Sequence, residues 1–241
     1  MGLEGFLALG FLIGMQHALE ADHLAAVGTM AVGRDASKRR LALRGAVWGL
    51  GHTITLFAIC TSVILMGLSL TDRVAAALEF GVGVMLVLLG LDVVRRMRRR
   101  RVHFHVHAHH GGRRHFHAHS HEGAAATHAQ DPHDHRHPSG FPLRALLIGL
   151  VHGAAGSAGL LALAVAATRE AWMALGYVVV FGLGSVLGMA ALSFVAAWPL
   201  GAAKRHARWI HGGLSLGAAA LAIVLGIDVM AETAAPAWGG F

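Results

Sequence analysis

Four ionisable side chains lie within seven positions of an otherwise apolar N-terminal stretch. They are His17, Glu20, Asp22 and His23. An ionisable side chain in the middle of a membrane costs roughly 2.5–3.5 kcal/mol on insertion scales, so such residues face the protein interior and have a function by default. Two imidazoles and a carboxylate suit borderline divalent ions such as Ni²⁺, Co²⁺, Zn²⁺ or Fe²⁺. The spacing therefore predicts a metal site.

A regular helix does not bring these side chains onto one face. At about 100° per residue, Asp22, His23 and Glu20 lie about 140°, 240° and 300° around the helix from His17. Either the helix is broken or bulged here, or a ligand comes from another helix. His52 is the nearest candidate partner, because glycines shortly before it in the sequence permit close approach of two backbones.

A second group of histidines lies in one polar segment. Thirteen of the 19 histidines fall between His103 and His137, and most of them occupy every second position. The segment is too polar to pack, so we expect it to be disordered. Dense neutral imidazoles bind borderline metals weakly at many sites, which predicts metal buffering, sensing or hand-over. The histidines assigned to this role are His103, His105, His107, His109, His110, His115, His117, His119, His121, His133, His135 and His137.

The elements that must position these residues are membrane helices. The chain has 241 residues, of which 55% are hydrophobic and 14% charged, and its mean hydropathy is +0.58, which excludes an ordinary soluble domain. A membrane helix needs roughly 20 apolar residues. We therefore predict an all-α polytopic membrane protein with six transmembrane helices, the first broken near the metal motif. The expected spans are 3–32, 42–70, 74–94, 142–168, 171–199 and 210–231.

The basic residues indicate the orientation of these spans. Of the 20 Lys and Arg residues, 18 lie in the connections 34–44, 95–144 and 204–208. Cytoplasmic connections are the ones that carry excess Lys and Arg. We expect these three connections, and so the histidine segment, in the cytoplasm, with both termini outside the inner (plasma) membrane. The net charge of +7 then reflects topology, and no nucleic acid partner is expected.

The two halves of the sequence resemble each other in order. The matching stretches are Leu12–His17 with Leu147–His152 (offset 135), Gly49–His52 with Gly182–Ser185 (offset 133) and Leu89–Val93 with Leu225–Val229 (offset 136). Three spans in each half make the second half cross the membrane in the opposite sense, which predicts a 3+3 inverted repeat with a site near the midplane. The expected domains are a first repeat over 1–97, the histidine segment over 98–141 and a second repeat over 142–241.

The repeat also pairs the chemistry of the two halves. His152 occupies the position equivalent to His17, Ser157 the position equivalent to Asp22, and Ser185 the position equivalent to His52. We expect these three residues, together with Glu20, to orient the metal ligands or to line the pathway of the ion. For His52 and His152 a purely structural role, a hydrogen bond between helices, is the alternative.

The motif His17-x4-Asp22-His23 resembles the signature of the nickel/cobalt transporter family, and Gly51-His52-Thr53 is similar to that family's Gly-His-Ser. The resemblance implies ligand or selectivity roles for His17, Asp22, His23 and His52. Larger members have eight spans and acidic motifs in later helices, and this chain lacks those carboxylates. It is closer to six-span, urease-accessory-type members. Its histidine segment resembles that of related efflux proteins, which have Gly-His where this chain has Asp22-His23.

We therefore predict a transporter of Ni²⁺ or Co²⁺ rather than an enzyme, with uptake favoured over efflux. The site consists of His17, Asp22, His23 and His52, the transported ion is the bound metal, and no prosthetic group is expected. Expected partners are the divalent ion, the lipid bilayer and maturation factors of a nickel enzyme. The alternatives are efflux of nickel, cobalt or zinc, a membrane-embedded metalloenzyme with Glu20 as its base, and a metal sensor.

Overall fold

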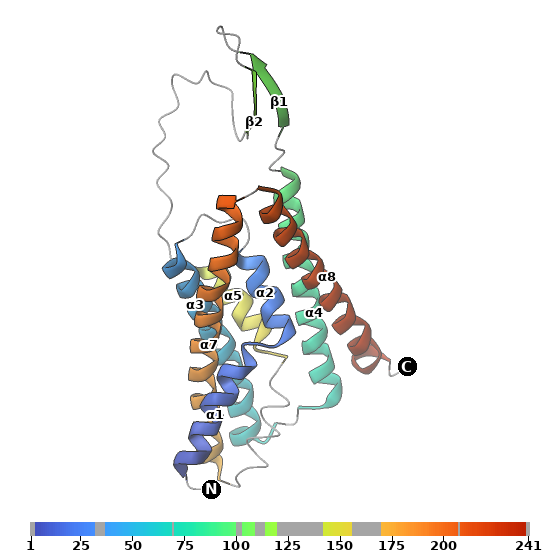
Figure 1. The fold of residues 1–241 in the computed structure, drawn as a ribbon. Coiled ribbons are helices and arrows are strands. Elements are labelled where there is room, and N and C mark those ends of the chain that lie inside the picture. Colours follow the sequence, from blue (N-terminus) through green and yellow to red (C-terminus); the bar gives the residue numbers. More distant parts are fainter. Residues whose placement is uncertain are drawn as a thin grey trace. The chain divides into compact units, whose positions relative to one another are not determined.

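The computed structural model describes the backbone of residues 3–31, 37–68, 70–99, 103–108, 114–119, 142–155, 170–206 and 208–239 (Figure 1). These residues form two compact units. One contains Met1–Val93 and Pro142–Phe241, and the other contains Val94–Phe141. The elements are α1 (Leu3–His17), α2 (Ala21–Ala31), α3 (Lys38–Met66), α4 (Asp72–Arg99), β1 (His103–Ala108), β2 (Arg114–His119), α5 (Leu143–His152), α7 (Ala171–His206) and α8 (Arg208–Trp238).

Four helices in the described part of the chain are long and apolar enough to cross a membrane. They cover Lys38–Met66, Asp72–Arg98, Ala171–Trp198 and Gly212–Trp238, and each overlaps a span expected from the sequence. The first expected span is divided into α1 and α2, each shorter than a membrane crossing. The expected span 142–168 is described only through α5 and the turn that follows it, because residues 156–169 lie outside the described residues.

The predicted break in the first helix is confirmed. Helix α1 ends at His17 and α2 begins at Ala21. In the turn between them, the backbone N–H groups of Leu19 and Glu20 donate to the carbonyls three residues earlier, at 2.9 and 3.1 Å. This tight winding resembles the 3₁₀ turns that interrupt helices at functional hinges. It changes the direction in which the side chains on its two sides project.

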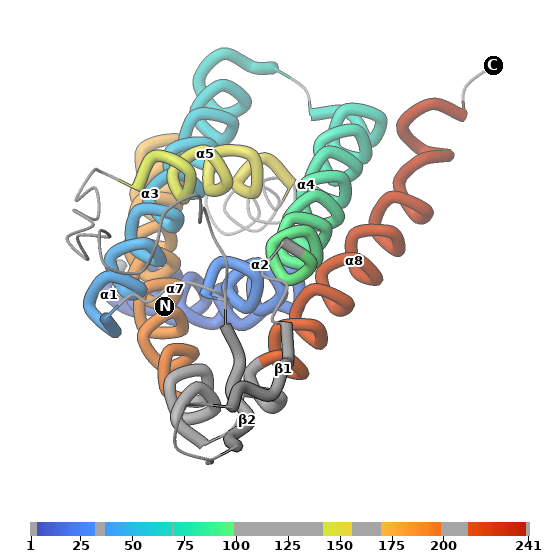
Figure 2. Tube along the Cα trace, turned by 90° about the horizontal axis from the view of Figure 1, so that it is seen from above, coloured from blue at the N-terminus to red at the C-terminus, as the bar shows by residue number. Residues whose placement is uncertain are grey.

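Helix α7 packs against both α1 and α3, and α3 also packs against α5 (Figures 1 and 2). Glycine makes these approaches close. A Cβ added at Gly14 in α1 would collide with the carbonyl oxygen of Phe181 in α7, and one added at Gly149 in α5 would collide with the carbonyl oxygen of Trp48 in α3. Gly14 and Gly149 differ by the offset 135, and Trp48 and Phe181 differ by the offset 133. The same contact therefore occurs at corresponding places in the two halves.

Two further pairs of contacts between glycine and backbone follow the same correspondence. A Cβ at Gly51 would collide with the carbonyl of Leu146, and a Cβ at Gly184 would collide with that of Phe11. In the outer pair of helices, which lie side by side in Figure 2, Gly90 of α4 meets the backbone of Ala219 in α8. Gly226 of α8 meets that of Gly83 in α4. The residues in each pair of contacts differ by the offsets found in the sequence.

The buried core surrounds these glycine contacts between helices. One cluster contains Trp48, Leu86 and Met189 among alanines and small aliphatic residues, and a second contains Leu56, Tyr177 and Phe181. At one edge, the guanidinium of Arg144 in α5 donates to Oδ2 of Asp92 in α4 at 2.6 Å. This ion pair joins the two halves of the sequence.

The other unit contains an antiparallel ribbon of β1 and β2. Its register sets His103 opposite His119, His105 opposite His117 and His107 opposite His115. Residues that alternate along a strand share one face of the ribbon. The composition of this segment predicts disorder, but twelve of its residues form the strands β1 and β2. The rest, including His109, His110, His121, His133, His135 and His137, lie outside the described residues.

Candidate metal centre

His17, the last residue of α1, has a different partner at each ring nitrogen. Its Nδ1 donates to Oε1 of Glu20 at 2.7 Å, and its Nε2 lies 3.2 Å from Nε2 of His52 in α3. Because a carboxylate only accepts, the proton of a neutral His17 ring is on Nδ1 and its Nε2 has a free lone pair. A separation of 3.2 Å suits two adjacent ligands of one ion, which lie about 3.0–3.4 Å apart for bonds of about 2.1 Å.

Asp22, in the first turn of α2, contacts two imidazoles. Its Oδ1 accepts the backbone N–H of His23 at 2.7 Å and lies 2.8 Å from Nδ1 of the same residue. Its Oδ2 lies 2.9 Å from Nε2 of His152, the last residue of α5. The carboxylate therefore connects a residue of the first half to one of the second. Its contact with His23 also fixes the proton of that ring on Nδ1 and leaves Nε2 free to bind a metal.

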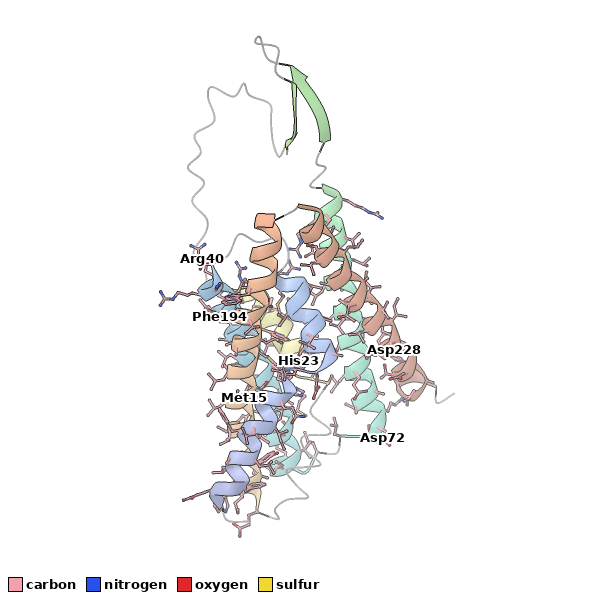
Figure 3. All side chains as sticks on the ribbon, viewed as in Figure 1. Met15, His23, Arg40, Asp72, Phe194 and Asp228 are labelled. Atoms are coloured by element: carbon pink, nitrogen blue, oxygen red, sulfur yellow. The ribbon has the colours of Figure 1, made fainter. Side chains whose placement is uncertain are left out.

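The four imidazoles form one compact group. His23, His52 and His152 are at most 1% exposed, whereas the side chain of His17 is 11% exposed. Ring centroids lie 4.5 Å apart for His17 and His23, 5.1 Å for His17 and His52, and 4.2 Å for His23 and His152. Figure 3 labels His23 among the helices, at a level between Arg40 at one end of α3 and Asp72 at the far end of α4.

Three ring nitrogens in this group are buried without a hydrogen-bond partner in the described part of the chain. They are Nε2 of His23, Nδ1 of His52 and Nδ1 of His152. A buried polar atom without a partner costs about 1–3 kcal/mol, so such atoms are rare without a function. For His23 the unpartnered nitrogen is the one with the lone pair. This arrangement indicates a ring prepared to bind a cation.

Aromatic side chains form the wall of the group. Trp48 in α3 is fully buried, and its ring centroid lies 5.3 Å from that of His23 and 5.6 Å from that of His152. Phe181 in α7 lies 5.3 Å from His17. Trp48 and Phe181 are equivalent positions of the two halves. Their apolar surfaces exclude water, which strengthens electrostatic interactions inside the group.

Two overlapping sets of side chains have the geometry to hold a metal ion. One contains His17, His23 and His52, and the other contains Asp22, His23 and His152; within each set the ligand atoms lie within 4.8 Å of one another. The four residues proposed from the sequence as metal ligands thus lie together. Glu20 joins them through its contact with His17.

The other candidates from the sequence have different surroundings. His152, expected to line the pathway or to orient a ligand, contacts Asp22 directly. Ser185 is fully buried, and its hydroxyl has no hydrogen-bond partner among the described residues. Ser157 lies outside the described residues. Sequence reasoning missed Trp48, although its place four residues before His52, one helical turn away, was an available signal.

Comparisons with known proteins agree with this chemistry. The family model described as "High-affinity nickel-transport protein" (NicO) matches residues 3–238. The chain is 32% identical over 229 residues to a urease accessory protein, UreH, of Bacillus sp. (strain TB-90), an alignment that covers 95% of this chain and 91% of that protein. No solved structure matches the chain. A buried histidine cluster between apolar helices and a match over nearly the whole length lead to one conclusion: the chain belongs to the family of high-affinity nickel-transport proteins.

Proposed function

We propose that the chain carries Ni²⁺ into the cytoplasm through a site made by Nε2 of His17, His23 and His52. The observation that carries the proposal is the convergence of these residues at the break between α1 and α2. Contacts of the other ring nitrogen with Glu20 and Asp22 leave Nε2 unprotonated in His17 and His23. Three neutral imidazoles suit Ni²⁺ and also Co²⁺, which prefer nitrogen ligands to the oxygen sets of Mg²⁺ or Ca²⁺.

The contacts suggest a role for Asp22 different from the ligand role expected from its sequence motif. Both of its oxygens are in contact with imidazoles. A carboxylate that accepts the second N–H of a ligating histidine fixes the ring orientation and raises the basicity of the other nitrogen. We assign this orienting role to Asp22 for His23 and to Glu20 for His17.

We further propose that the helices form six membrane spans as a 3+3 inverted repeat, with repeats at 1–97 and 142–241. The paired glycine contacts support this arrangement, because equivalent positions in the two halves make equivalent contacts. The broken helix counts as one span and the segment that begins with α5 as another. Interrupted helices at a repeat interface are where secondary transporters bind their cargo.

The charge distribution supports a cytoplasmic position for the segment 98–141 and outside positions for both termini of a protein in the inner membrane. We propose that the histidines of this segment buffer Ni²⁺ after its release. The β1–β2 register supports this role by setting histidine opposite histidine three times. Because the similar Bacillus protein is named a urease accessory protein, we propose maturation factors of a nickel enzyme as recipients of the ion.

The direction of transport follows from the motif. The chain has Asp22-His23 where related efflux proteins have Gly-His, so we propose uptake. Proteoliposomes with Ni²⁺ outside and a nickel-quenched dye inside measure the direction for protein inserted in a known orientation. Movement of Ni²⁺ across the membrane away from the side that carries the histidine segment would establish efflux instead.

The site is tested by His17→Ala in the same assay. We expect Ni²⁺ transport to fall on the order of 100-fold, since loss of a ligand weakens metal binding at least as much as loss of an orienting group. Ser62→Ala is the matched control, because Ser62 is partly exposed on α3 and, among the described residues, its hydroxyl donates to the carbonyl of Ala58 in the same helix. Transport by His17→Ala at the rate of the control would remove His17 from the site.

The topology is tested by single cysteines. The only native cysteine, Cys60, is buried, so the native chain is a suitable background. A membrane-impermeant maleimide applied to intact cells should label Thr71→Cys and should not label Arg40→Cys. The reverse pattern would invert the proposed orientation.

A further inference from the structure

We infer that the cargo ion has a second binding position beside the three-histidine site, formed by Asp22, His152 and the Nδ1 edge of His23. The inference rests on the proposed function and deepens it. The three residues belong to α2 and α5, so this second position lies between the two halves of the sequence, whereas the three-histidine site belongs to the first half alone.

The distances support a metal position as well as a hydrogen-bonded one. Asp22 Oδ2 lies 2.9 Å from Nε2 of His152, and Oδ1 lies 2.8 Å from Nδ1 of His23. Adjacent ligand atoms of one ion lie about 3.0–3.4 Å apart, so each imidazole is within a few tenths of an ångström of that distance from its own oxygen of Asp22, and the ligand atoms of the three residues lie within 4.8 Å of one another. A carboxylate and two imidazole nitrogens form a donor set that nickel, cobalt and zinc accept.

Binding of an ion at the second position requires a change of tautomer in both rings. A ring nitrogen binds a metal only without its proton, so the proton must be on the other nitrogen of a neutral ring. In His23 and His152 that other nitrogen is Nε2 and Nδ1 respectively, and both are buried without a partner in the described residues. Each ring thus changes tautomer when the ion binds and stays neutral, with no net gain or loss of protons.

His23 is the residue that the two positions share. The three-histidine site uses its Nε2 and the second position uses its Nδ1, which are separated by Cε1 and point away from each other. An ion that moves between the positions therefore remains next to His23 throughout.

The transport test uses His152→Gln and His152→Ala in the otherwise native chain. A glutamine amide still donates a hydrogen bond to Asp22 but binds Ni²⁺ poorly. If His152 forms part of a second position, both variants should lose transport at least about tenfold. If His152 only holds Asp22 in place, His152→Gln should transport at the native rate, and that result would overturn the inference.

The binding test separates the two positions. Ni²⁺ alone is the probe, and all thirteen histidines between His103 and His137 are replaced by asparagine so that they do not contribute. His52→Ala and His152→Gln should each still bind one Ni²⁺, and X-ray absorption should show fewer imidazole ligands and a carboxylate oxygen in His52→Ala. The variant that carries both His52→Ala and His152→Gln should bind no Ni²⁺. Equal affinities for the double variant and His52→Ala would overturn the inference, whereas absence of transport by the native chain would overturn the proposed function itself.

Discussion

The two halves of the chain share their packing and differ in their chemistry. Gly14 against Phe181 has its equivalent in Gly149 against Trp48, yet His52 of the first half has the buried hydroxyl of Ser185 as its counterpart. Close backbone contact constrains both halves alike, because any side chain larger than hydrogen would collide there. Metal chemistry makes no such demand on both halves. The difference teaches that two halves can preserve equivalent contacts between helices while one of them contains most of the proposed ligands.

The largest expected difference between the halves is between His52 and Ser185. His52→Ala should lower Ni²⁺ transport on the order of 100-fold because it removes a proposed ligand. Ser185→Ala should lower it far less, because the hydroxyl has no hydrogen-bond partner in the described residues. Initial rates in proteoliposomes measure both. A larger loss in Ser185→Ala than in His52→Ala would reverse the assignment of chemistry to the first half.

The two carboxylates that contact the histidine cluster, Asp22 and Glu20, should rank by burial. Asp22→Asn should lower Ni²⁺ affinity by about 10–100-fold, the range for loss of a group that orients a metal ligand. Glu20→Gln should have a smaller effect, because the side chain of Glu20 is 56% exposed and water replaces its contact with His17. Calorimetric titration with Ni²⁺ measures both affinities, in protein whose thirteen histidines between His103 and His137 are replaced by asparagine. Equal losses of Ni²⁺ affinity in the two variants would show that the burial of a carboxylate does not determine its contribution to metal binding.

The equivalent glycine contacts, Gly14 with Phe181 and Gly149 with Trp48, predict equal effects on stability. Gly14→Ala and Gly149→Ala should each lower the free energy of unfolding by about 1–3 kcal/mol, the usual cost of overpacking. Gly81→Ala is the control, because its added Cβ meets nothing within 4 Å and alanine favours the helix. Thermal unfolding in detergent measures all three. Destabilisation by only one of the two crossing variants would break the equivalence of the halves.

The ion pair between the halves should contribute least. Arg144→Ala should lower the free energy of unfolding by about 0.2–1 kcal/mol, the range for exposed ion pairs, since the Arg144 side chain is 51% exposed. The same unfolding measurement applies, repeated at high salt, where the difference from the native chain should shrink. A difference that does not depend on salt would point to packing instead.

The sequence predicted the helix break for a sound physical reason. One face of a regular helix does not hold both His17 and His23. The structure separates the two residues, because α1 ends at His17 and α2 begins at Ala21. The sequence did not predict that both oxygens of Asp22 would meet imidazoles. Residue types and spacing identify which groups suit a metal, but the atom that each group presents depends on helix rotation and on contacts made far along the chain. The contact between Asp22 and His152, 130 residues apart, is of that kind.

The overlap with the expected spans has a similar explanation. Apolar length alone located α3, α4, α7 and α8, because a membrane crossing has a minimum length. Their ends differ from the expected bounds, since local caps decide where a helix begins and ends. Helix α3 begins four residues before its expected span, where the Ser37 hydroxyl accepts the N–H of Arg40, and it ends at Met66, where Gly67 follows with a left-handed φ of 66°. Hydropathy does not detect such caps.

The break after His17 also affects the electrostatics of the backbone. Where one helix stops and another starts, the carbonyl end of α1 carries a partial negative charge and the amide end of α2 a partial positive one. A cation is attracted by the first and repelled by the second, and the Asp22 carboxylate in the first turn of α2 offsets that repulsion. The electrical profile that an ion meets is thus set partly by main-chain dipoles, which no side-chain substitution removes.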